Sequence, residues 1–293
     1  MRRPAATPML LLALLVLVPL AFVTGLVAAG LLASSSGRGR DYVIRLTLPP
    51  AHEIGLPPVE GPLDPGRPLV VIDAGHGGRD PGAGSADMPE KQVTLALADA
   101  LRRQLLAEGG VRVALTRSDD RFLLLPERSG MARRLGADLF ISIHADSADN
   151  LGASGATLYT LSDRGSSDEA ARLAAKENRA DTINGVSLTR QSDAVNAILV
   201  DLAQRESVGL SEQFARLVLR EGAGRLRFRP QPLQSAAFVV LKTPDMASVL
   251  FEAGYISNEQ DAAALTSDEG REAFARVTAR AIRVFFARQL TGA

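Results

Sequence analysis

Two histidines and a glutamate are the residues of this sequence best suited to chemistry. His76 lies in the glycine-rich segment at 73–78 (DAGHGG), and His144 closes a strongly apolar run. Glu90 lies in the first turn of a predicted amphipathic helix. Two neutral imidazoles and one carboxylate can hold Zn²⁺ and leave a fourth position for water, as zinc hydrolases do. The residue types therefore point to metal-assisted hydrolysis.

Each of these residues has a plainer explanation when it is taken alone. A glutamate in a first helical turn often only complements the helix dipole. A lone histidine is more often part of a hydrogen-bonded structure than a metal ligand. The composition limits the possible metal ligands, because the chain has no cysteine and only three histidines, His52, His76 and His144. His52 falls in a stretch rich in proline and glycine, where a mobile chain makes a poor ligand, and we set it aside.

Glu252 ends another apolar run, residues 248–252 (SVLFE). A carboxylate at the end of a buried strand is costly unless it has a partner, which could be a water, a metal or an arginine. Beside a metal, an unligated glutamate can take a proton from water and pass it to a leaving nitrogen. The residues alone leave open whether Glu252 does this or forms a salt bridge.

The elements that must position these residues follow an alternating pattern from Leu69 onwards. The pattern predicts an α/β fold, a three-layer αβα domain with a mixed, largely parallel sheet. Functional groups in such sheets gather outside the carboxyl ends of the strands. His76, His144 and Glu252 each lie at a predicted strand end, so we expect them at one edge. The predicted strands are 69–72, 111–115, 137–146, 155–161, 237–241 and 248–252, and the predicted helices start near 90, 126, 170, 193 and 270.

Three further regions surround this pattern. Residues 1–36 are predicted to be a signal peptide or signal anchor, because Arg2 and Arg3 precede an almost uncharged stretch of membrane-spanning length. Residues 37–68 read as a linker with one candidate strand, and residues 69–293 as the catalytic domain. Within the domain, about residues 165–224 form a polar helical insertion, which is either ordinary packing or a lid.

The charge balance excludes one large class of partner. The chain has 33 basic and 33 acidic residues and a formal net charge of zero, so nothing indicates a nucleic-acid-binding protein. Its hydrophobic content of 46% and charged content of 23% are typical of a folded globular protein.

Taken together, the motifs resemble the zinc-dependent N-acetylmuramoyl-L-alanine amidases of the cell-separation type. The resemblance covers about residues 69 to 288 and rests on four features in this order: DAGHGG at 73–78, Glu90, SIHAD at 142–146 and EAGYISN at 252–258. It implies hydrolysis of the amide between the lactyl group of N-acetylmuramic acid and L-alanine of the peptidoglycan stem peptide. It also implies Zn²⁺ as cofactor, with His76, Glu90 and His144 as ligands and Glu252 as the general base.

The resemblance further implies partners and a location. Peptidoglycan as the substrate places the protein in the periplasm or cell envelope, with the N-terminal segment in the inner membrane if it is not cleaved. In amidases that separate daughter cells, an inserted helix can cover the zinc until an activator with a LytM-type domain withdraws it. Glu177 is the matching candidate for an inhibitory carboxylate, and its plainer explanation is a solvated glutamate on a helix.

Two other functions remain open from the sequence. A catalytically silent peptidoglycan-binding protein could keep the fold, although the loss of Glu252 or of a ligand would then be expected, and all four residues are present. A zinc peptidase acting between stem-peptide residues would use the same metal chemistry on a neighbouring bond. Product masses separate these functions, because only the amidase releases stem peptides with a free L-alanine amine.

Overall fold

The computed structural model describes residues 55–291, apart from 86–87, 149, 151, 184–185, 188–196 and 244. The predicted signal segment and the candidate strand in the linker lie outside the described residues. Among the helices that the structure does describe, none is long and apolar enough to cross a membrane. The unit Gly55–Ala293 is the one considered below.

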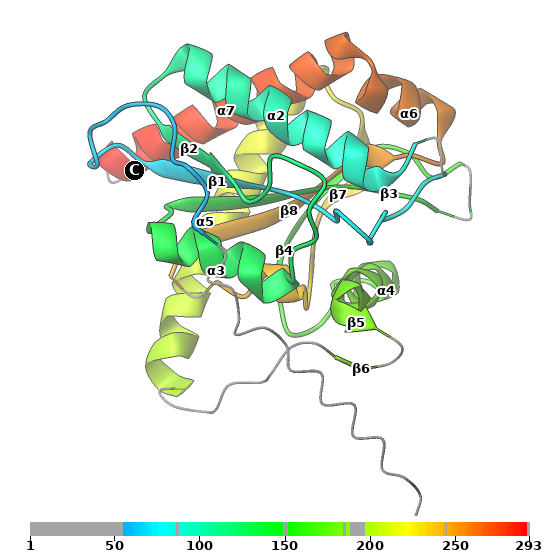
Figure 1. Ribbon diagram of the computed structural model, residues 1–293, viewed down its shortest axis with the longest axis horizontal. Helices are drawn as coiled ribbons and strands as arrows, with labels where there is room; N and C mark the ends of the chain where they lie inside the picture. The colour runs from blue at the N-terminus through cyan, green and yellow to red at the C-terminus, as the bar shows by residue number, and fades with distance from the viewer. Residues whose placement is uncertain are drawn as a thin grey trace, which may run out of the picture. The chain divides into compact units, whose positions relative to one another are not determined.

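A six-stranded mixed sheet lies at the centre of this unit (Figure 1), in the order β2-β1-β3-β8-β4-β7. The first four strands of that order are parallel, β4 is antiparallel to β8, and β7 is parallel to β4. This arrangement confirms the predicted mixed, largely parallel sheet. The bounds are β1 (Leu69–Ala74), β2 (Arg112–Leu115), β3 (Leu139–Asp146), β4 (Ala156–Leu161), β7 (Phe228–Ala236) and β8 (Ala247–Tyr255).

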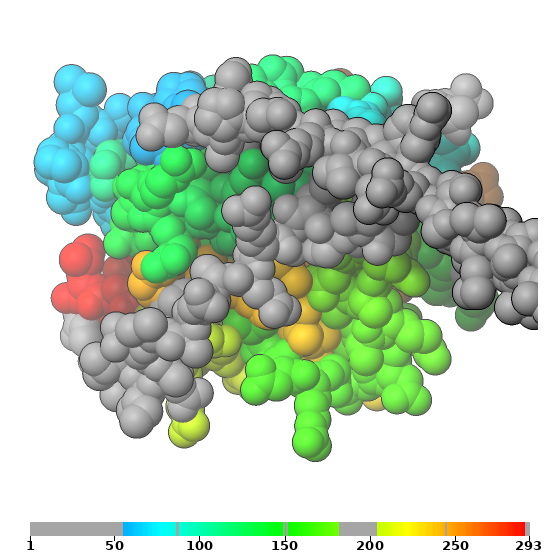
Figure 2. Space-filling view, turned by 60° about the horizontal axis from the view of Figure 1, so that its bottom comes forward, coloured from blue at the N-terminus to red at the C-terminus, as the bar shows by residue number. Residues whose placement is uncertain are grey.

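Helices cover both faces of the sheet and complete the predicted three layers. Successive side chains of β1 point to opposite faces, so that Val70 and Ile72 pack in one buried cluster and Leu69 and Val71 in another. The first cluster is covered by α2 (Glu90–Glu108), α5 (Ala197–Gly222), α6 (Glu259–Thr266) and α7 (Asp268–Thr291). The second cluster is covered by α3 (Leu125–Leu135) and α4 (Asp168–Glu177). These two helices, green and yellow-green, lie on the face shown in Figure 2.

One predicted strand is wrong. We expected a strand at 237–241, but the sheet uses β7 instead, and Val239–Leu241 form a short 3₁₀ helix, η2. Pro230 and Pro232 argue against a strand over the residues of β7, yet β7 lies at the edge of the sheet, where proline is tolerated. The apolar run after β7 is buried beside α3 and α4 rather than paired in the sheet.

The predicted helical insertion divides into two parts with different roles. Its second part, α5, packs against the sheet and α7 and contributes Phe214, Leu217 and Val218 to the core. Its first part contains α4, the 3₁₀ helix η1 (Asn178–Asp181) and the two-residue strands β5 (Thr182–Ile183) and β6 (Val186–Ser187). Because α5 is part of the core, only the segment before it could move without unfolding the domain.

The last residues of the predicted linker pack onto the domain. Glu60 forms two backbone hydrogen bonds with Val113 of β2, at 2.8 and 2.9 Å. The Glu60 carboxylate also accepts a hydrogen bond from Arg102 of α2 at 2.8 Å. From residue 55 onwards the chain therefore belongs to the same unit as the sheet.

Candidate metal centre and active site

The four residues singled out by sequence lie together at the carboxyl edge of the sheet. His76 follows β1, and Glu90 is the first residue of α2. His144 of β3 and Glu252 of β8 occupy paired positions on neighbouring strands. The loop that carries His76 is tied to β3 by a hydrogen bond of 3.0 Å from Gly75 N–H to the Ile143 carbonyl. Parallel strands that end at one edge thus bring together residues far apart in the sequence.

The side chains of His76, Glu90 and His144 form a buried cluster suited to a cation. Their potential ligand atoms all lie within 4.8 Å of one another. His76 Nε2 lies 3.1 Å from Glu90 Oε2, and His144 Nδ1 lies 3.1 Å from Glu90 Oε1. His76 Nε2 is buried without a well-formed hydrogen bond. A buried imidazole nitrogen that lacks a partner and faces a carboxylate fits a bound metal ion.

A second carboxylate sets the orientation of the His76 ring. Asp80 Oδ2 lies 2.8 Å from His76 Nδ1, so that Nδ1–H donates to Asp80 and Nε2 remains free to bind a metal. This carboxylate–histidine arrangement is typical of metal sites. Burial lowers the pKa of His76, but the carboxylates of Glu90, Asp80 and Glu177 raise it well above its usual value. Burial raises the pKa of Glu90, but the two histidines hold it well below its usual value.

The backbone at His76 is strained, and the surrounding glycines are required by space. His76 has φ of 60°, and no other non-glycine residue in the described ranges has a positive φ. A Cβ atom at Gly75 would lie 2.5 Å from the His144 ring, and one at Gly82 would lie 2.6 Å from Glu90 Oε2. The glycine-rich sequence therefore lets the backbone approach the side chains of His144 and Glu90 closely.

Arg128 of α3 holds this loop from one side, and the residue is only 2% exposed. It donates to Asp73 Oδ1 at 2.9 Å and to the carbonyls of Ala74 and His76, both at 2.8 Å. Burial raises the pKa of Asp73, but Arg128, together with hydroxyl hydrogen bonds, holds it below its usual value. The buried carboxylate and the loop carbonyls supply the partners that a buried guanidinium needs.

Arg117, two residues after the end of β2, is a second buried arginine at the site that the sequence did not reveal. Its guanidinium donates to the carbonyls of Ala74, Gly75 and Lys91 at 2.8–2.9 Å. Gly75 precedes His76 and Lys91 follows Glu90, so one side chain links the segments that carry two of the candidate ligands. Burial and the charge of Arg128 lower the pKa of Arg117 to about 10, which leaves it charged at neutral pH. Its position just after a strand end is the signal that could have identified it.

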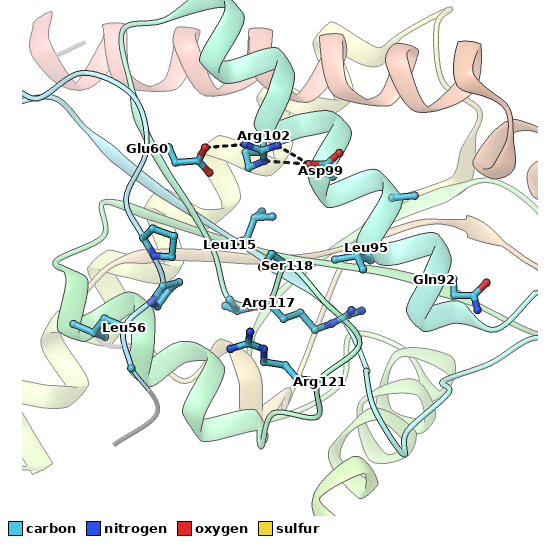
Figure 3. A pocket seen from close by; sticks show the side chains of 15 residues that line it. Leu56, Glu60, Gln92, Leu95, Asp99, Arg102, Leu115, Arg117, Ser118 and Arg121 are labelled. Atoms are coloured by element: carbon cyan, nitrogen blue, oxygen red, sulfur yellow. Dashed lines mark hydrogen bonds and ion pairs between the residues drawn. The ribbon is translucent and has the colours of Figure 1, made fainter. Parts of the chain in front are cut away.

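Figure 3 shows Arg117 at a cavity of about 870 Å³ between residues 55–60, α2 and the residues after β2. The guanidinium of Arg117 points toward the start of α2, where Gln92 lies. The guanidinium of Arg121 points away from the start of α2. This cavity contains none of His76, Glu90, His144 and Glu252. The cavity is therefore separate from the cluster of candidate ligands.

Glu252 has the environment expected of a proton carrier. Its Oε2 accepts a hydrogen bond of 3.1 Å from Asp146 N–H, and its Oε1 is buried without a partner. In the part of the chain that the structure describes, no arginine pairs with it, which removes the salt bridge that the sequence had left open. Burial and the nearby carboxylates of Asp146, Glu90 and Glu177 raise the pKa of Glu252 well above its usual value.

Glu177, the last residue of α4, points into the same cluster. Its Oε2 lies 3.3 Å from His76 Nε2 and 3.4 Å from His144 Nδ1. The residue is 5% exposed, so it is not a solvated glutamate on a helix surface. The neighbouring Lys176 forms an ion pair with Asp146 beside Glu252. In this structure the end of α4 therefore lies against the two histidines of the cluster.

Comparison with known proteins identifies the family. A family model described as N-acetylmuramoyl-L-alanine amidase matches residues 70–284. The chain belongs to this family. It is 37% identical over 223 residues to the N-acetylmuramoyl-L-alanine amidase AmiA of Escherichia coli (strain K12), covering 75% of this chain and 77% of that protein.

Two further amidases support the assignment. The N-acetylmuramoyl-L-alanine amidase AmiC of Neisseria meningitidis serogroup B is 37% identical over 219 residues, which cover 74% of this chain and 51% of that protein. The solved structure of the amidase AmiC2 of Nostoc punctiforme has a TM-score of 0.54 and 28% sequence identity, covering 76% of this chain and 99% of that chain. The family assignment indicates a hydrolase, and the buried cluster fits a metal site in such an enzyme.

Proposed function

We propose that this chain is a zinc-dependent amidase of the cell envelope. It hydrolyses the amide between the lactyl group of N-acetylmuramic acid and the L-alanine of the peptidoglycan stem peptide, and so acts in cell-wall remodelling and daughter-cell separation. Membership of the amidase family supports the choice of bond. The observation that carries the chemistry is Glu252, with one unpartnered oxygen, beside the cluster of His76, Glu90 and His144.

His76, Glu90 and His144 would hold the zinc ion through His76 Nε2, His144 Nδ1 and the Glu90 carboxylate. Bound zinc lowers the pKa of a water molecule and polarises the carbonyl of the substrate. Asp80 accepts the proton on Nδ1 of His76, which orients the ring so that Nε2 faces the position of the metal. Arg117 and Arg128 hold the backbone from which His76 projects.

Glu252 moves the proton in the proposed reaction. Its carboxylate accepts a proton from the attacking water and transfers it to the amide nitrogen as the carbon–nitrogen bond breaks. The products are the lactyl carboxylate on the sugar and a stem peptide with a free L-alanine amine. Burial and the nearby carboxylates raise the pKa of Glu252, which is the direction that helps a carboxylate to hold a proton before it passes it on.

We further propose that α4 keeps the enzyme inactive. The Glu177 carboxylate faces both histidines and would take the position that a water molecule must occupy. Substrate can reach the cluster only when α4 moves away, and a LytM-domain activator is the partner expected to move it. Residues 1–36, outside the described part, would tether the enzyme to the inner membrane if they are not cleaved.

Digestion of purified peptidoglycan, read by mass spectrometry, tests the function. We expect zinc-loaded Glu177→Ala protein to release stem peptides with a free L-alanine amine, and the Glu177→Ala/Glu252→Gln protein to release none. Peptides cut between stem residues would instead favour the zinc peptidase. A folded, zinc-loaded Glu177→Ala protein that releases no product would favour the silent peptidoglycan-binding protein.

A further inference from the structure

Helix α4 presents two carboxylates to the sheet edge, one near each end. Glu177 lies against the histidines, and Glu169, eight positions earlier, pairs with Arg229 of β7. The pair is bidentate, with Arg229 Nη1 donating to Glu169 Oε1 at 2.7 Å and Nη2 donating to Oε2 at 2.9 Å. This fork geometry is the form in which arginine recognises a carboxylate.

The topology of the sheet brings Arg229 to the edge that carries the site. β4 runs antiparallel to β8 and β7 runs parallel to β4, so β7 begins where β8 ends. Arg229 is the second residue of β7, and its Nη1 also donates to the hydroxyl of Tyr255, the last residue of β8, at 2.7 Å. Its side chain is 18% exposed, whereas that of Glu169 is 48% exposed. A partly buried cation is thus covered by a carboxylate from a separate helix.

Movement of α4 would remove the carboxylate partner of Arg229 together with Glu177. A partly buried guanidinium without a counter-charge is unfavourable, so the open enzyme would present a site that favours an anion. We propose that Arg229 binds a free carboxylate of the stem peptide, and that Glu169 occupies this subsite in the closed enzyme. The proposal rests on the proposed function, because it assigns the peptide side of the same site.

The spacing of the two carboxylates indicates which part of the substrate Arg229 can reach. Eight helical residues at 1.5 Å each place Glu169 about 12 Å from Glu177 along α4. Two strand spacings, from β8 to β7, give a similar lateral distance of about 10 Å. An extended peptide covers such a distance in about three residues. The carboxylate bound by Arg229 should therefore be carried by about the third residue after the scissile amide.

Two soluble muropeptides test the subsite. They are identical except that the side-chain carboxylate of a diaminopimelate at the third peptide position is free in one and amidated in the other. The measured quantity is the ratio of their kcat/KM values with zinc-loaded Glu177→Ala protein. Taking the ratio within one variant cancels any effect on the opening of α4, because both substrates meet the same open fraction.

We expect the free carboxylate to be preferred by about tenfold or more, the size typical of a charge-assisted hydrogen-bonded pair. Adding Arg229→Gln should bring the ratio close to one, and Arg229→Lys should keep part of the preference, because it retains the charge without the fork. Arg227→Gln is the matched control. Arg227 lies two residues earlier, is exposed and contacts Gln260, so its loss should leave the ratio unchanged.

Equal kcat/KM values for the two substrates would overturn the subsite, and so would a preference that survives Arg229→Gln. Should Arg229→Gln fail to fold, the Arg229→Lys variant decides. An undiminished preference for the free carboxylate in Arg229→Lys would also refute bidentate binding by Arg229. Cleavage of neither muropeptide by folded, zinc-loaded Glu177→Ala protein would refute the proposed function itself, and the subsite with it.

Discussion

Replacement of Arg117 by glutamine should weaken metal binding although Arg117 is not a ligand. The guanidinium joins the carbonyls of Gly75 and Lys91, each adjacent in sequence to a proposed metal ligand. It therefore sets the separation of His76 and Glu90. Glutamine is shorter and has a single amide donor group, so it cannot span both carbonyls.

The expected losses of stability and of zinc affinity follow from the hydrogen bonds that remain after Arg117→Gln. The Gly75 carbonyl keeps a hydrogen bond of 2.9 Å from the Thr94 hydroxyl, and the Ala74 carbonyl keeps one from Arg128. Both loop carbonyls keep a partner, and glutamine can replace one of the three hydrogen bonds that Arg117 donates to the carbonyls of the two segments that it joins. Loss of the other two charge-assisted hydrogen bonds should lower the free energy of unfolding by about 3–6 kcal/mol. Loss of an outer-shell partner typically lowers metal affinity by about 10–100-fold, and we expect this range for zinc.

Zinc affinity would be measured by competition with a chromophoric chelator, and the visible spectrum of the cobalt-substituted protein would report ligand geometry. Arg121→Gln is the control, because Arg121 borders the same cavity but is half-exposed and pairs only with Asp119 among the residues described. If Arg117→Gln lowers the unfolding free energy but leaves zinc affinity and the cobalt spectrum unchanged, Arg117 only stabilises the fold. That result would refute the claim that Arg117 sets the separation of His76 and Glu90. Thr94→Val, which removes one hydroxyl between the same segments, should show a smaller loss of affinity.

Three further predictions concern individual residues. Glu252→Gln should retain zinc but lower kcat by about 10²–10⁴-fold, since only proton transfer is removed; a near-normal rate would contradict its role. His76→Ala should lose most of its zinc by elemental analysis, and full occupancy would exclude His76 as a ligand. The folded-state pKa of Asp73 is lowered, so its contribution to stability is complete above about pH 4 and is lost as the pH falls through the lowered value. Asp73→Asn should therefore reduce the unfolding free energy at pH 7 by about 3–5 kcal/mol and flatten its dependence on acidic pH, and an unchanged acid dependence would contradict the pairing with Arg128.

The residues of the cluster could be selected from sequence because each lies at the end of a regular element. Apolar runs before His144 and Glu252 predict buried strands, and the carboxyl ends of parallel strands meet at one edge. Glu90 could be added because the apolar periodicity that follows it predicts a helix start. The α/β class follows from the same local patterns, since strand and helix periods differ.

The position of β7 could not be read in this way. Two prolines argue against a strand, and only its place at the sheet edge makes them acceptable. The division of the helical insertion is a similar case. α4 and α5 both read as polar helices, and which of them belongs to the core depends on what each packs against.

The sequence by itself determined which groups can do the chemistry, whereas the tertiary structure decided how they are held and covered. Arg117 and Arg128 look like surface arginines in sequence, but the carbonyls of a strained glycine-rich loop draw both into the interior. Glu177 and Glu169 are ordinary helix glutamates until the sheet edge places two histidines and Arg229 opposite them. Local patterns record the period of an element, but a buried charge is stable only where distant segments supply its partners.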